Sequence, residues 1–230
     1  MTTSGTYNFN PSLGELVLYA YNLAGLRNTS LLQEHMQTAR VAANMMLSRW
    51  SNQGVNLWQV DLVTVPLVQG QSVYSVDPST VMILDGYMGT VSGSTETDRI
   101  VLPISRTEYA SYPNKQQQGF TTVFWFDRLL SPSVTLWPVP DGTSAQYFKY
   151  YRVRQLQDAN YAGGQTVDIP YLWMEAFSDG LAYRLARIWN PTMAIALKAQ
   201  ADESYQIAAS QNVEQANQYI SPQIAGYYRP

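Results

Sequence analysis

The sequence predicts an α+β fold: a helical bundle formed by the N-terminal and C-terminal helices, an inserted antiparallel β-sandwich or open barrel, and an extended C-terminal tail. Apolar residues recur at helical spacing before residue 57 and after residue 168, and between them the spacing changes to the alternation of strands. With 46% hydrophobic residues over 230 residues, the chain can bury a sizeable core. We expect N-terminal helices over 1–56, an inserted β domain over 57–157, C-terminal helices over 158–217 and a tail over 218–230.

Two helices are expected at the start of the chain. Ser12 and Glu15 form an S-x-x-E capping box, and the helix that follows can end at Gly25 in the left-handed conformation. Ser30 and Gln33 repeat the capping pattern ahead of a long amphipathic helix. The apolar stripe of this second helix consists of Met36, Ala39, Ala43, Met46, Leu47 and Trp50.

Seven short β-rich runs follow, and they predict the inserted sheet. They are Leu57–Val65, Ser72–Val76, Val81–Tyr87, Arg99–Ile104, Thr121–Phe126, Val134–Trp137 and Ala145–Arg154. Gly86 and Gly89 are among the residues expected to form turns, which makes residues 86–98 a polar loop. Ser105 and Glu108 form a further capping box, so a short helix is expected over Arg106–Tyr112.

Helical spacing returns after Asp168, which is an N-cap candidate with Pro170 in the first turn. The sequence Asn190-Pro191 separates this helix from the next one, whose apolar stripe runs from Ala194 to Ala216.

The tail after Glu214 lacks acidic residues and contains Pro222, Gly226 and Pro230, which prevent a regular helix to its end. In water it would expose apolar side chains, so we expect it to fold back or, preferably, to dock on a partner. The candidate interface residues are Tyr219, Ile220, Ile224, Tyr227, Tyr228 and Arg229.

Composition favours a protein that buries surface against other chains. Only 13% of the residues are charged, against roughly 25% in typical soluble domains, and 13% are aromatic. An ordinary tyrosine-rich monomer is the alternative. The net charge of -3 disfavours tight binding of nucleic-acid phosphates, and the absence of cysteine is compatible with a reducing compartment. The start of the chain lacks the pattern of a signal peptide, and no apolar run approaches the roughly 18 residues of a membrane span.

The sequence lacks the patterns of common catalytic sites. His35 is the single histidine, and the sequence contains no G-x-S-x-G motif with a serine nucleophile that it could activate. We expect His35 to be a surface or helix-packing residue. Neither a P-loop nor a zinc or EF-hand motif is present. We therefore predict a structural protein rather than an enzyme, with no cofactor and no metal.

One rival function is a carbohydrate-binding or carbohydrate-active β protein. Tryptophans could stack on sugars, and two carboxylates suffice for glycoside hydrolysis. The tryptophans in question are Trp58, Trp125 and Trp137. The carboxylates are Asp61, Asp85, Glu96, Asp98, Glu108 and Asp127. Core packing and solvated carboxylates explain the same residues without a site.

The order of several short motifs resembles the head-to-tail adaptor family of short-tailed bacteriophages, also called head-completion proteins or tail accessory factors. The likeness covers roughly residues 12–217. It rests on the two opening helices, the G-x-x-x-Y-x-V-D-P turn of Gly70–Pro78, the strand Val81–Leu84, the run Leu102–Tyr109, the strand Phe124–Leu130, the segment Leu136–Asp141 with its P-x-P-D turn, the strand Tyr147–Arg152, the sequence Asp168-Ile169-Pro170 and the helix Leu181–Ala186.

The resemblance implies a virion protein that assembles in the host cytoplasm at the junction of portal vertex and tail. Subunits would form a ring, dodecameric like the portal, and extend a channel through which genomic DNA passes without sequence-specific binding. Partners would be the portal protein, which the tail from Tyr219 to Pro230 would enter, and tail hub, nozzle or fibre proteins. No membrane is implied. A tail-tube component is an alternative that shares this ring architecture.

Overall fold

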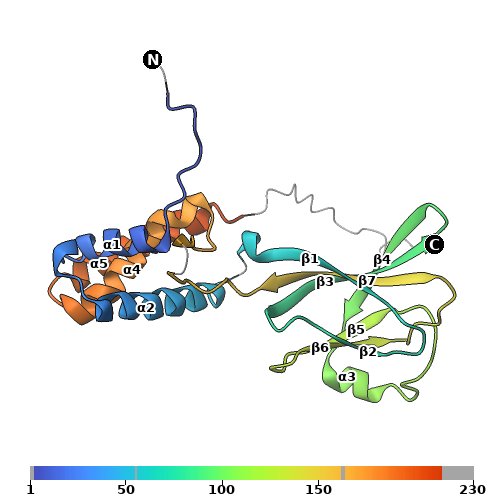
Figure 1. The fold of residues 1–230 in the computed structure, drawn as a ribbon. Coiled ribbons are helices and arrows are strands. Elements are labelled where there is room, and N and C mark those ends of the chain that lie inside the picture. Colours follow the sequence, from blue (N-terminus) through green and yellow to red (C-terminus); the bar gives the residue numbers. More distant parts are fainter. Residues whose placement is uncertain (1–2, 55, 162–163, 214–230) are drawn as a thin grey trace, which may run out of the picture.

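The computed structural model describes residues 3–54, 56–161 and 164–213. Helices from both ends of the chain lie together on one side of the molecule, and a curled sheet lies on the other (Figure 1). This arrangement confirms the predicted α+β fold. The bundle helices are α1 (Leu13–Leu23), α2 (Gln33–Ser51), α4 (Met174–Trp189) and α5 (Ala194–Ser210).

The helix α1 begins as its sequence predicts. The Ser12 amide donates to the Glu15 carboxylate at 2.8 Å, and the Glu15 amide donates to the Ser12 hydroxyl at 3.4 Å. The predicted Ser30 cap of α2 is wrong, because Ser30 ends a short 3-10 helix (η1, Asn28–Ser30) and donates to the Arg27 carbonyl. Instead, the Leu32 amide at the start of α2 donates to Nδ1 of His35 at 3.1 Å.

The predicted cap at Asp168 is also wrong. Its carboxylate binds Arg154, and Pro170 precedes a 3-10 turn (η4, Tyr171–Trp173) that leads into α4. The helix α5 ends at Ser210, so the expected continuation through Val213 is wrong as well. Ala216 lies outside the described residues. Both errors concern helix ends, where tertiary contacts compete with local signals.

Seven strands form one sheet in the order β1-β7-β3-β4-β5-β6-β2, which curls into the open-barrel form of the prediction. Its pairs are antiparallel, except that β4 and β5 pair in parallel over two residues. A short helix, α3 (Arg106–Ser111), connects β4 to β5 and is capped by Ser105, as predicted. The strands are β1 (Val60–Pro66), β2 (Val73–Ser75), β3 (Thr80–Ser92), β4 (Thr95–Pro103), β5 (Val123–Asp127), β6 (Ser133–Trp137) and β7 (Ala145–Arg154).

The polar loop expected over residues 86–98 is wrong. Gly86 and Gly89 lie inside β3, which forms a long hairpin with β4 around Gly93 at φ 62°. A Cβ at Gly86 would lie 2.8 Å from the Phe124 ring and 3.0 Å from the Phe148 ring. The glycine therefore serves close packing inside the sheet and not a turn.

Two separate hydrophobic clusters hold the molecule together. One cluster gathers the inner faces of α1, α2, α4 and α5, and the other fills the concave side of the sheet. The connecting segment after β7 packs on the helical cluster through Ala159 and Val167. Asn44 on α2 fixes this segment, because its side chain donates to the Ala159 carbonyl at 3.1 Å and accepts from the Ala159 amide at 2.9 Å.

Candidate functional site

The six residues predicted to form a partner interface, Tyr219, Ile220, Ile224, Tyr227, Tyr228 and Arg229, lie outside the described residues. The structure describes the chain up to Val213, which follows α5 and exposes its side chain. The candidate surfaces that the structure does describe lie on the helical bundle and on the segment before it.

A groove of about 720 Å³ lies between α1, the start of α4 and the end of α5, and we call it the α1/α5 groove. Its walls carry large apolar side chains that stay exposed to water: Phe9, Tyr19, Tyr171, Leu172 and Ile207. Glu15 and Glu175 add two carboxylates to the lining. The hydrogen bonds that Glu15 accepts from the Ser12 amide and hydroxyl lower its pKa and keep it ionised.

A second groove, of about 560 Å³, lies between α2 and α4, and we call it the α2/α4 groove. Its apolar lining includes Val41, Met45 and Ile188, each more than half exposed. Arg184 and Arg187 stand on the α4 side. This groove is therefore apolar with a basic wall, in contrast to the acidic α1/α5 groove.

The basic wall continues toward α5, where a neighbouring hollow is lined by Arg49, Arg184, Arg187 and Lys198, with Asp202 as the acidic member. Burial, together with the charges of Arg49 and Arg187, lowers the pKa of Arg184. Within the described ranges none of these three arginines forms an ion pair. Net charge alone does not show this cluster, although the i, i+3 spacing of Arg184 and Arg187 in a helix is a signal that could have revealed it.

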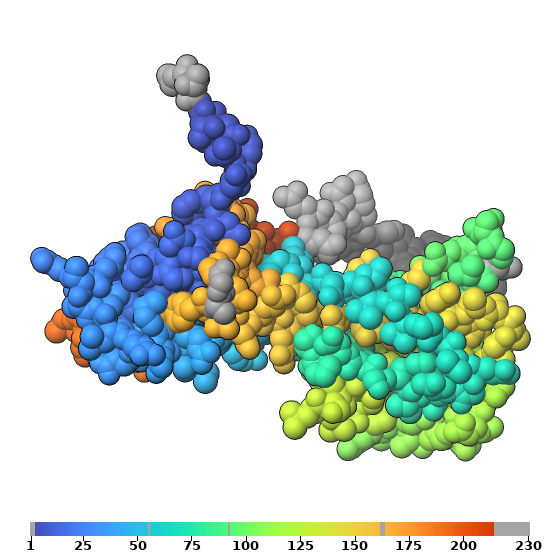
Figure 2. Space-filling view, in the orientation of Figure 1, coloured from blue at the N-terminus to red at the C-terminus, as the bar shows by residue number. Residues whose placement is uncertain are grey.

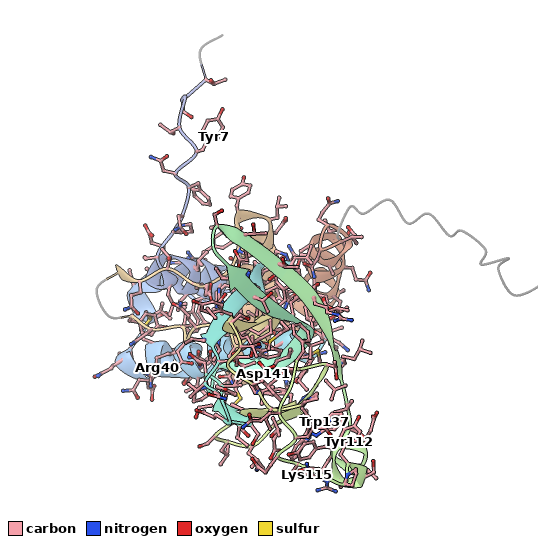
Figure 3. All side chains as sticks on the ribbon, turned by 90° about the vertical axis from the view of Figure 1, so that its right-hand side faces the viewer. Tyr7, Arg40, Tyr112, Lys115, Trp137 and Asp141 are labelled. Atoms are coloured by element: carbon pink, nitrogen blue, oxygen red, sulfur yellow. The ribbon has the colours of Figure 1, made fainter. Side chains whose placement is uncertain are left out.

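The segment from residue 3 to residue 11, which we call the N-terminal arm, stands away from the body of the molecule (Figure 2). Tyr7 is 100% exposed and Phe9 is 69% exposed. Figure 3 shows the Tyr7 side chain well clear of the bundle. Sequence reasoning did not single out this arm, because two aromatics in a polar stretch give no periodic signal.

Several candidate carboxylates of the β region are held in ion pairs. Asp61 on β1 binds Arg152 on β7 at 2.7 Å, and Glu96 and Asp98 on β4 both bind Lys149 on β7. Hydrogen bonds to Glu96 and Asp98 raise the pKa of Lys149. The Asp61 pair joins two neighbouring strands, and the Lys149 pairs join β7 to β4 across β3, so both are structural uses of the charges.

The remaining three candidate carboxylates belong to three different elements of the fold. Asp85 is exposed on β3, Glu108 is exposed in the first turn of α3, and Asp127 ends β5.

The three candidate tryptophans have aromatic partners inside the molecule. Trp58 packs on Trp173 of the helical cluster with ring centroids 4.8 Å apart. Trp137 stacks on Tyr112 at 4.1 Å with an interplanar angle of 7°, and the Lys115 ammonium donates to the Tyr112 carbonyl at 2.7 Å (Figure 3). Trp125 stacks on Tyr109 in the same way at 5.7 Å. Residues of α3 and its C-cap therefore cover Trp125 and Trp137, and Trp173 covers Trp58, which favours packing over sugar binding.

His35 is a packing residue, as predicted, and it also helps to begin α2. Its ring stacks on Trp189 of α4 at 4.1 Å, and its carbonyl accepts from the Tyr21 hydroxyl of α1 at 2.6 Å. Burial raises the pKa of Tyr21 to about 12, with Tyr161 contributing. His35 thus connects three helices.

In the part of the chain that the structure describes, no three His, Asp or Glu side chains gather as metal ligands would. Over the same residues no helix combines the length and apolar character of a membrane span.

A protein-family model described as SU10 adaptor protein matches residues 20–225. The match begins within α1 and includes the β region, α4 and α5. The search of curated proteins finds no match.

Proposed function

This chain belongs to the SU10 adaptor protein family, a family of phage head-to-tail adaptors, and on that premise we propose that it forms a ring joining the portal vertex to the tail. The family makes the chain a structural adaptor of a bacteriophage virion. The ring is proposed to be dodecameric like the portal and to lengthen the channel through which the genome leaves.

The observation that carries this proposal is the apolar surface of the helical bundle. Both grooves leave large apolar side chains in water beside charged residues, and apolar surface with a polar rim is typical of protein–protein interaction sites. Interfaces in assemblies bury such surface and are poor in charge at their centres, which fits a chain with 13% charged residues. A ring of subunits would cover this surface.

The portal contact is proposed to come from residues 219–230. The helix α5 leads toward this segment, whose candidate side chains are tyrosines and isoleucines together with Arg229. An apolar segment that orders on its partner would make attachment depend on the portal being present. The opposite end of the ring would meet tail hub, nozzle or fibre proteins.

The test is the binding of the full chain to portal rings of the same phage, observed by electron microscopy. Replacing Tyr219, Ile220, Ile224, Tyr227 and Tyr228 with serine should abolish adaptor density on the portal, because the apolar anchors are lost. The replaced chain should keep the wild-type circular dichroism and melting temperature.

A matched control replaces the polar residues Asn217, Gln218 and Gln223 with serine and should bind normally. Normal binding by the variant that lacks the five tyrosine and isoleucine side chains would refute the portal contact. A tail-tube component, the alternative with the same architecture, would stack on itself or on tail proteins without needing the portal.

A further inference from the structure

The N-terminal arm carries exposed aromatic side chains, and the α2/α4 groove is an apolar hollow. The arm presents the side chains of Tyr7 and Phe9 to water, and the Tyr7 side chain is fully exposed. The groove is a hollow of about 560 Å³ with an apolar lining, a volume in the range of sites that bury organic groups. An exposed aromatic side chain is of the size and chemistry that such a hollow can bury.

The two features lie on different faces of the bundle. The arm leaves the body beside the α1/α5 groove, where Phe9 and Pro11 form part of the lining. On α4 that groove uses Met174, Glu175 and Ser178, whereas the α2/α4 groove uses Arg184, Arg187 and Ile188. A helix turns by about 100° per residue, so these two groups of α4 side chains point in directions roughly 130° apart around the helix axis. A contact between two different faces of neighbouring subunits is heterologous. Repeated from subunit to subunit, it forms a ring when the successive rotations add up to a full turn.

The charges around the two faces are also complementary. Glu15 and Glu175 flank the base of the arm, and Arg184 and Arg187 form the wall of the α2/α4 groove. Opposite charges that meet across an interface favour the correct partner face over the same face of another copy. The arginines can in addition lie over an aromatic ring that enters the groove.

The arm is long enough to reach a neighbour. Its nine residues span at most about 30 Å when extended, and two packed helices are roughly 20 Å wide. An arm that starts at one face can therefore cross the adjoining face of the next subunit.

We propose that the N-terminal arm of one subunit lies in the α2/α4 groove of the next subunit around the ring, with Tyr7 as its anchoring side chain. This inference rests on the proposed ring. It assigns the lateral contact to one segment and one groove, whereas the contact with the portal belongs to residues 219–230.

Cross-linking through introduced cysteines tests the contact directly, because the chain has no cysteine of its own. The full-length double variant Tyr7→Cys, Met45→Cys is assembled on portal rings and oxidised. Arm exchange around a ring should give a ladder of covalent dimers, trimers and higher species under denaturing conditions. The control pair is Tyr7→Cys with Leu130→Cys, since Leu130 is 98% exposed on the loop after β5, and this pair should give no ladder.

The outcomes separate this contact from the ring itself. Rings seen by electron microscopy without a ladder overturn the arm contact and leave the proposed function standing. Covalent dimers alone show a reciprocal exchange and overturn the head-to-tail contact. If neither rings nor a ladder form, both proposals fail.

A second experiment measures how much the Tyr7 side chain contributes to ring assembly, without introduced cysteines. Tyr7→Ala should raise the concentration needed for ring assembly by about tenfold or more, the effect of truncating an aromatic anchor at an interface. Thr6→Ala is the matched control and should leave assembly unchanged. Both variants should melt like the wild type, since the Tyr7 side chain is fully exposed and adds nothing to the core. Equal assembly by the two variants overturns the role of Tyr7.

Discussion

Asp168 illustrates how a residue can carry a local signal and serve a distant partner. Its position before Pro170 is typical of a helix N-cap, yet its carboxylate accepts hydrogen bonds from Arg154 at 2.5 and 3.1 Å and from the Gln157 amide at 3.1 Å. Arg154 ends β7, so this pair joins the end of the sheet to the segment that leads into α4. A capping pattern contains no information about an arginine fourteen residues upstream.

The first prediction concerns the pH dependence of this pair. Hydrogen bonds from Arg154, supported by the Gln157 amide, hold the pKa of Asp168 below its usual value. A carboxyl with a lowered folded pKa stabilises the protein above its unfolded pKa of about 3.9, and this contribution is lost as the pH falls through the folded pKa. Asp168→Asn should therefore cost about 2 kcal/mol at pH 7, a melting temperature lower by about 4–8 °C.

The same variant should lose less stability than the wild type when the pH is lowered from about 4 to about 2. Thermal melts followed by circular dichroism across this range measure both effects. Asp158→Asn is the control on the same segment, because Asp158 is exposed and pairs with no cation in the described part of the chain. Equal melting profiles for the two variants would contradict the role of the Arg154 pair.

At the scale of elements, β3 shows where local sequence patterns mislead. Gly86 and Gly89 were expected to form turns, because glycine is the residue most typical of them. Inside the strand, Gly86 makes room for two rings from β5 and β7, and Gly89 lets Lys149 pass from β7 across β3 to Asp98 on β4. Both uses depend on strands distant in sequence, so the glycines alone could not reveal them.

The second prediction compares these two glycines. Gly86→Ala should destabilise the protein by about 2 kcal/mol, because the new Cβ would lie 2.8 Å from the buried ring of Phe124 and 3.0 Å from that of Phe148. Gly89→Ala should cost less, since its nearest neighbours are the outer atoms of the Asp98 and Lys149 side chains, which can turn away more easily than a buried ring. Both changes place alanine in the same strand, so intrinsic strand preference cancels in the comparison.

Urea unfolding of the two variants measures the difference in the free energy of unfolding. A cost for Gly89→Ala equal to or greater than that for Gly86→Ala would mean that close ring packing does not explain Gly86.

At the scale of the whole molecule, the sequence predicted the segments and the joining of N- and C-terminal helices in one bundle, but it gave no order for the strands of the sheet. The positions of α1, α2, α4 and α5 follow from apolar spacing, which is a local property. The sheet order is not local, because β1 pairs with β7 across most of the β region. The grooves were not predicted either, since the exposure of Met45 or Ile188 depends on which helix packs beside it. The predicted C-terminal interface remains a proposal.

The two clusters bear on the proposed inserted domain over residues 57–157. The described members of the sheet cluster lie within this range: Tyr74, Val76, Met88, Val101, Phe124, Val134, Leu136, Phe148 and Tyr150. The clusters share no residue. Near the proposed boundaries, however, Trp58 and Leu156 pack on the helical cluster. A domain with its own core is expected to fold alone, whereas these two side chains would stabilise only the whole chain.

The last prediction therefore compares the effect of Trp58→Ala on the full chain with its effect on the isolated segment 57–157. The isolated segment 57–157 should unfold in a single cooperative thermal transition. Trp58→Ala should lower the stability of the full chain by about 3 kcal/mol, because Trp58 loses its contact with Trp173, but should leave the melting temperature of the isolated segment unchanged. Phe148→Ala, which empties the centre of the sheet cluster, is the control that should destabilise both proteins. A segment that fails to unfold cooperatively, or that Trp58→Ala destabilises as much as the full chain, would mean that sheet and bundle form one folding unit.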